Sequence, residues 1–126
     1  MKGLIVLLVL LLAGCHSQAE GFVLDGRAPQ AISEWPSNEF TEELPQPQSG
    51  QMDYVYDYSE AGRYMIFITD LTRAEAEAYV QELEEQGFHR TFSDSNNASG
   101  GVMLANDTTQ LNIAYSNGGM GIWITK

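Results

Sequence analysis

The sequence predicts a small α+β domain, in which an antiparallel sheet with the element order ββαββββ carries one helix packed on a face. Two observations predict this fold. Apolar and polar residues alternate in several short segments separated by turn residues, which is the period of a half-buried strand. One segment, at about 73–86, instead spaces its apolar residues for a helix that faces a core. Because strands joined by short turns pair antiparallel, these segments are expected to form one sheet.

Two of the six expected strands are predicted to lie at the centre of the sheet. The strand at 64–69 is apolar on both faces, as is typical of a strand that is covered on both sides. The strand at 120–125 places three apolar residues on one face. A polar loop is expected at 93–101. The remaining strands are expected at 52–58, 88–93, 102–105 and 110–116.

The helix has recognisable ends. Thr72 and Glu75 form a capping box, in which the hydroxyl and the carboxylate each accept a hydrogen bond from a free backbone amide. Gly87 is expected just past the last turn, where a left-handed backbone ends many helices. The side chains predicted to face the core are Ala76, Tyr79, Val80 and Leu83.

The first fifteen residues carry the most specific motif of the chain. A positive Lys2 precedes an apolar run of nine residues at 4–12. That run is too short for a mature membrane span of about 20 residues, and it suits a signal peptide. Leu12, Ala13, Gly14 and Cys15 then look like the lipobox of bacterial lipoproteins. This resemblance implies that a signal peptidase recognises the first three residues, that the Cys15 thiol is lipidated, and that residues 1–14 are removed.

An ordinary buried cysteine is the alternative reading of Cys15. The position of the residue, where the apolar run stops and a polar segment starts, argues against that alternative. A lone cysteine also excludes an intramolecular disulfide and a cysteine-based zinc site.

The charge of the chain restricts its partners. Six Lys and Arg against 17 Asp and Glu give a net charge of −11, and loss of Lys2 with the signal peptide makes it −12. A nucleic-acid partner bound through its phosphates is therefore excluded. Attraction to anionic lipid headgroups is excluded as well, so the lipid on Cys15 must provide the membrane attachment.

Two segments precede the predicted core strands. Residues 15–33, beginning with the lipidated cysteine, show no strand or helix period and are interpreted as a flexible tether. Residues 34–126 are assigned to a single domain, whose first part, at 34–51, contains several prolines. We interpret that part as an extended strap pinned to the core by Trp35, Phe40 and Leu44. A proline-rich docking ligand is the alternative.

Few residues suggest chemistry. Glu82 and Glu85 are read as part of a solvated helix face, and residues 94–99, which place Ala98 at a calcium-ligand position, as a turn. His89 has no nucleophile or metal-ligand spacing around it. We therefore expect no catalytic residue, metal or cofactor. The candidate partner surface consists of Tyr54, Tyr56, Tyr58 and Trp123, for which cross-strand packing is the alternative.

The chain resembles a family of small uncharacterised bacterial lipoprotein domains. The resemblance rests on the lipobox, on Trp35-Pro36 and Leu44-Pro45-x-Pro47 in the strap, and on the helix end Tyr79-x-x-x-Leu83-x-x-x-Gly87-Phe88. It covers about residues 34–126. It implies the order lipobox, tether, strap, strands, helix and final strands, and it implies no activity beyond lipidation of Cys15.

Three functions remain open at this point. The first is a non-enzymatic protein-binding or envelope-assembly module, and the second is a domain that captures a small ligand or cation. The third, a hydrolase, is ranked last because no motif supports it. The protein is expected outside the cytoplasm. In a bacterium with two membranes, His16 after the cysteine favours the periplasmic face of the outer membrane.

Overall fold

The computed structural model describes residues 27–126. The predicted signal peptide, Cys15 and the first part of the predicted tether lie outside these residues. Within residues 27–126, no helix is long and apolar enough to span a membrane.

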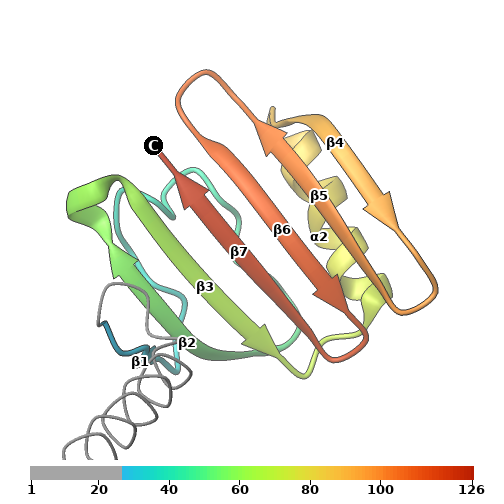
Figure 1. Cartoon of the computed structure of the whole chain (residues 1–126), viewed down its shortest axis with the longest axis horizontal. Helices are drawn as coiled ribbons and strands as arrows, with labels where there is room; N and C mark the ends of the chain where they lie inside the picture. The colour runs from blue at the N-terminus through green and yellow to red at the C-terminus, as the bar shows by residue number, and fades with distance from the viewer. Residues whose placement is uncertain (1–26) are drawn as a thin grey trace, which may run out of the picture.

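The predicted fold class is confirmed. One antiparallel sheet has seven strands in the order β1-β2-β3-β7-β6-β5-β4 among the described residues, and one helix packs behind it (Figure 1). Strands β3 and β7, which were predicted to be central, pair with each other in the middle of the sheet. The strands are β1 (Gln30–Ala31), β2 (Gln51–Tyr58), β3 (Arg63–Thr69), β4 (His89–Ser95), β5 (Ser99–Ala105), β6 (Gln110–Ser116) and β7 (Gly119–Thr125). A 3₁₀ turn, Ser59–Ala61, joins β2 to β3.

Two strands are longer than predicted. The loop expected at 93–101 is mostly strand, because β4 continues to Ser95 and β5 begins at Ser99. Only residues 96–98 turn, and the Asn96 carboxamide oxygen accepts hydrogen bonds from the amides of Ala98 and Ser99. Sequence alternation missed this extension because β4 lies at the sheet edge, where all seven of its residues are exposed and its outer part is polar. The turn interpretation of 94–99 therefore holds only for 96–98.

The sheet also reaches further toward the N-terminus than the domain boundary placed at residue 34. Gln30 and Ala31, which were assigned to the tether, pair with Val55 and Tyr54 of β2. Two residues are too few to show a strand period in the sequence.

Helix α2 (Arg73–Glu85) has the predicted ends. The capping box of Thr72 and Glu75 is present in both directions. At the other end the Phe88 amide donates to the Leu83 carbonyl and the Gly87 amide donates to the Glu84 carbonyl, which is the Schellman arrangement. The four predicted core residues of the helix are buried.

The strap packs beside α2 on the same side of the sheet (Figure 1). Its predicted anchors Phe40 and Leu44 are buried, and Trp35 packs against the core while half-buried. The Phe40 ring stacks on Tyr64 at 5.6 Å. The Tyr79 hydroxyl donates to the Pro45 carbonyl at 2.8 Å, so the strap is held to the helix as well as to the sheet.

Glu43 fastens the strap to the turn between β5 and β6. Its carboxylate accepts hydrogen bonds from Asn106 Nδ2 at 3.1 Å and from the hydroxyls of Thr108 and Thr109 at 3.2 and 3.3 Å. The hydrogen bond from Asn106 is the main cause that lowers the pKa of Glu43 below its ordinary value of 4.5.

A lowered pKa in the folded state means that ionised Glu43 stabilises the fold above the unfolded pKa, and that this contribution is lost as the pH falls through the folded value. We therefore expect the wild-type chain to lose more stability between about pH 7 and about pH 3 than the variant Glu43→Gln. Urea unfolding at a series of pH values measures this difference. Glu39→Gln, an exposed position in the same strap, is the control. Equal pH dependence in wild type and Glu43→Gln would contradict the assignment.

Candidate functional site

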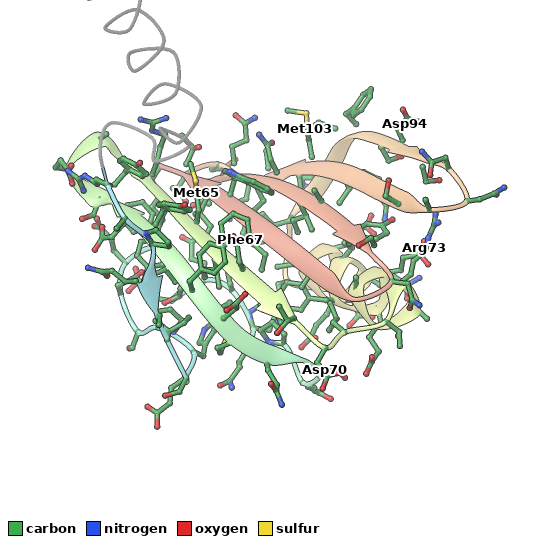
Figure 2. The ribbon with its side chains drawn as sticks, turned by 60° about the horizontal axis from the view of Figure 1, so that its bottom comes forward. Met65, Phe67, Asp70, Arg73, Asp94 and Met103 are labelled. Carbon is green, nitrogen blue, oxygen red and sulfur yellow. The ribbon has the colours of Figure 1, made fainter. Side chains whose placement is uncertain are left out.

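The two faces of the sheet have different surroundings. Helix α2 and the strap cover one face, and no described element covers the other, which we call the open face (Figure 1). Figure 2 shows Met65, Met103 and Asp94 on the side of the sheet away from α2. The strand register arranges the side chains of the open face in four rows that run across the strands.

Two neighbouring rows form the middle of the open face. The ridge row contains mostly large side chains, and the groove row is small where it crosses β7, β6 and β5. The ridge row consists of Tyr56, Met65, Trp123, Asn112, Met103 and Phe92. The groove row consists of Tyr54, Phe67, Gly121, Ala114, Gly101 and Asp94.

Two outer rows border them. The first outer row lies beside the ridge row, and the second outer row lies beside the groove row and carries hydroxyl groups. The first outer row consists of Tyr58, Arg63, Thr125, Gln110, Ala105 and His89. The second outer row consists of Gln51, Thr69, Gly119, Ser116 and Ser99.

Aromatic rings contact one another at the β2 end of the open face. Tyr54 stacks on Phe67 with ring centroids 4.6 Å apart, and Phe67 meets Trp123 edge to face at 5.3 Å. Tyr56 contacts Tyr54 and Phe67 edge to face at 5.7 and 6.1 Å. Partial burial is the main cause that raises the pKa of Tyr54. These rings are half-buried by one another and leave the rest of their surface to solvent.

The structure places all four candidate surface residues on the open face, but Tyr58 differs from the others. Tyr58 is only 3 % exposed. The guanidinium groups of Arg27 and Arg63 lie over its ring, 4.9 and 5.4 Å from the centroid. The Tyr58 side chain therefore serves in packing, which was the alternative to a partner surface in the sequence analysis. It offers little surface to a partner.

Sequence reasoning missed four large apolar residues of this face. Met65 and Phe67 alternate with the core-facing residues of β3, and Met103 does so in β5. Alternation along each strand places these residues on the face opposite the core residues. A strand that is apolar on both faces, however, does not show which of its faces is covered. Phe92, at 57 % exposure, is the exposed large hydrophobic residue of the described chain. A β-bulge between Arg90 and Phe92 sets the face to which Phe92 belongs, and the sequence does not reveal that bulge.

A shallow groove of about 420 Å³ follows the small residues of the open face. Tyr54 and Phe67 form its wall, and its floor includes Ala114, Gly119 and Gly121. The hydroxyl-bearing residues on its border are Thr69, Ser99 and Ser116.

The open face is nearly free of acidic residues although the domain is strongly acidic. Two of the 17 Asp and Glu precede residue 27, and of the 15 that remain only Asp94 belongs to the four rows. Asp53 borders the groove. The other acidic residues lie on the helix, the strap, the turns and the covered side. Negative charge is therefore distributed around this face and not over it.

Within residues 27–126, no group of three or more His, Cys, Asp and Glu could hold a metal ion. His89 is exposed at the start of β4. Every buried side-chain nitrogen or oxygen of the described residues has a hydrogen-bond partner, so none is left aimed into a cavity.

The position of the Trp123 ring depends on the absence of a side chain at residue 121. A Cβ on Gly121 would lie 2.8 Å from Trp123 Cζ3 and 3.1 Å from Phe67 Cε1. We expect Gly121→Ala to displace the indole and to cost about 1–2 kcal/mol of stability, as overpacking does. The indole N–H signal of Trp123 in a two-dimensional NMR spectrum, assigned with a Trp35→Phe variant, reports the displacement.

Gly101→Ala is the matched control, because a Cβ there meets its nearest neighbour, the Ile113 carbonyl oxygen, at an ordinary 3.8 Å. An unchanged indole signal in Gly121→Ala would show that the ring does not rest over residue 121.

No known protein family, curated protein or solved structure matches the chain.

Proposed function

We propose that this protein is a membrane-anchored, non-enzymatic binding module that contacts a protein partner through the open face of its sheet. One observation carries the proposal: an uncovered face rich in aromatic residues and methionine is nearly free of acids in a strongly acidic domain. Depletion of charge together with enrichment of Tyr, Trp, Phe, Met and Arg is the composition of protein interfaces. Trp123, Tyr54 and Tyr56 are the proposed contact residues, with Phe67, Met103 and Phe92 added.

The anchor part of the proposal rests on the sequence. The apolar run and the lipobox ending at Cys15 support a lipidated chain outside the cytoplasm, at the outer membrane where two membranes are present. Anchoring suits a binding module, because it raises the effective concentration of the domain near a partner in the same membrane.

Replacing Cys15 by Ser tests the anchor. We expect the wild-type protein to stay in the membrane fraction after a high-salt wash and Cys15→Ser to leave it, because lipid chains hold the protein without relying on charge. Mass spectrometry of the N-terminal peptide identifies the acyl groups. A Cys15→Ser protein that remains in the washed membranes would refute the lipid anchor.

Cross-linking in native envelopes tests the binding surface. We expect the wild-type chain to give a reproducible cross-linked protein, and Trp123→Ala to lose it while keeping the wild-type circular dichroism spectrum. Ala78→Ser, an exposed position on α2, is the control that should keep the cross-link. Capture of nothing by the wild type would overturn the proposal, and turnover of an envelope polymer by the purified domain would then favour a hydrolase.

The groove supports a second candidate, capture of a small ligand. Its wall is aromatic and its border carries hydroxyl groups, which suit a neutral molecule. A ligand that binds only the folded state raises the melting temperature by mass action. A concentration-dependent rise that disappears in Ala114→Leu, which fills the groove floor, would favour this candidate.

A further inference from the structure

We propose that the occupant of the open face is a second copy of this chain, bound sheet against sheet about a two-fold axis that runs across the strands. The inference deepens the proposed function and rests on it, because it names the protein partner of the same surface. The contact would leave the two helices on the outside and the two open faces inside.

The size of the face fits a stable dimer. Six strands spaced about 4.8 Å apart, with seven residues at about 3.4 Å each, give a face of roughly 700 Å². Two such faces in contact cover on the order of 1,400 Å² in total, within the range of about 1,200–2,000 Å² for specific protein interfaces. Two twisted sheets pack face to face in this way at an angle of about 30°.

Charge points to the same contact. The domain carries many more acids than bases, so two copies repel each other through most of their surface. When two copies meet through their open faces, few acidic residues of one copy face acidic residues of the other, since Asp94 is the single acid of the four rows. Burial of the face also removes the half-buried aromatic rings, Met103 and the exposed Phe92 from water, which stabilises the associated form. Met65 is already buried in the single copy.

The row pattern is self-complementary where it crosses β6 and β5. A two-fold axis placed between the ridge row and the groove row lays the ridge row of each copy over the groove row of the other. At β6 and β5 this sets Asn112 over Ala114 of the second copy and Met103 over Gly101 of the second copy. At these two strands each copy sets a longer side chain over a small one in both directions, so close packing is centred there. At β3 the same axis lays Met65 over Phe67, and at β4 it lays Phe92 over Asp94.

The same axis places charges favourably at the border. It lays the first outer row of one copy over the second outer row of the other, so that Arg63 lies over Thr69 on β3. Asp53, which borders the groove near Thr69, brings a carboxylate to that side. Because the operation is symmetric, the contact occurs twice.

Other occupants fit the face less well. Sugars stack on a free aromatic ring face, whereas Tyr54 and Phe67 stack on each other and Trp123 contacts the Phe67 ring. Pairing of two β4 edge strands is disfavoured by the bulge between Arg90 and Phe92, a feature that interrupts a strand ladder.

The experiment uses the mature chain from residue 15 with Cys15→Ser, so that lipid does not drive association. Analytical ultracentrifugation between about 1 and 200 µM covers dimers whose dissociation constants lie in that range. We expect a concentration-dependent dimer. Met103→Glu, which puts a carboxylate into the ridge row of both copies, is expected to weaken it by about 100-fold. Phe92→Ala weakens it less, and this exposed position leaves the fold intact.

Ala78→Glu adds the same charge to an exposed position of α2 and is expected to leave the dimer unchanged.

A short bis-maleimide tests the mode of contact. Residue 112 lies on the open face, so the variant Asn112→Cys is expected to cross-link between copies. Ala78→Cys lies on the helix and should not. Melting curves of each variant verify that the domain is folded.

The possible results separate this inference from the function on which it rests. The inference is supported if Met103→Glu dissociates the dimer and Ala78→Glu leaves it intact. A chain that stays monomeric, or a dimer insensitive to Met103→Glu, overturns it. If the monomeric chain still loses an envelope partner on Trp123→Ala, the proposed function stands with a different protein as partner. A monomer that captures no partner removes both.

Discussion

The free energy of unfolding is expected to fall by about 3 kcal/mol when Leu83 is replaced by Ala, because large-to-small changes at fully buried leucines cost about 2–5 kcal/mol. Leu83 is fully buried where α2 packs on the sheet. The helix contributes only four buried side chains, and Leu83 is among the largest of them. Removal of its isobutyl group leaves a cavity between two packed layers that the surrounding side chains fill incompletely.

Urea unfolding followed by circular dichroism measures the loss. Gln81→Ala, exposed on the same helix, is the control and is expected to change stability by less than about 0.5 kcal/mol. A loss below about 1 kcal/mol in Leu83→Ala would show that the helix is not packed on the sheet as described.

Gly50→Ala is the second large effect, again with a loss of about 3 kcal/mol, because a strained backbone and a steric clash add at one position. Gly50 connects the strap to β2 and has a φ of +89°, which side chains disfavour. A Cβ there would lie 2.7 Å from Ile68 Cγ2 and 2.9 Å from the Thr69 carbonyl oxygen. The second contact is with backbone, so a rotamer change cannot relieve it.

Gly87→Ala separates the two causes. Gly87 also has a positive φ, +104°, but a Cβ there would meet no atom within 4 Å. Its replacement is expected to cost only about 1 kcal/mol, from backbone strain alone. Equal losses in the two variants would mean that the contacts around Gly50 do not matter, and that the strap is not held against the end of β3.

A dimer formed through the open faces would explain why this domain tolerates a single helix. This sheet carries large apolar side chains on both faces, and the helix and strap cover one of them. A second copy would cover the other and give four layers, with the acidic helices facing solvent. With the lipid that we propose on each Cys15, two anchors in one assembly would also hold it on the membrane more firmly than one.

Part of the candidate surface was predictable from the sequence. Tyr54, Tyr56 and Trp123 were identified because alternation places them on the faces of strands. Phe67, Met103 and Phe92 were not identified, since the side of the sheet that is covered depends on where the helix and strap pack. Tyr58 was included although two arginines cover it, one of which, Arg27, is 31 residues away in the chain.

The sequence by itself determined the element types, the helix ends and the central pair of strands. These depend on local physics: the capping box at Thr72, the glycine at residue 87, and the apolar period of each segment act within one or two turns of chain. Only the tertiary structure decided the strand order, the extension of β4 and β5, and the existence of an uncovered face. Those features depend on contacts between distant segments, such as Tyr115 lying over Gly100 and Gly121 leaving room for Trp123. Local pattern carries no record of such pairs, so the full extent of the surface proposed to bind a partner emerges only from the folded sheet.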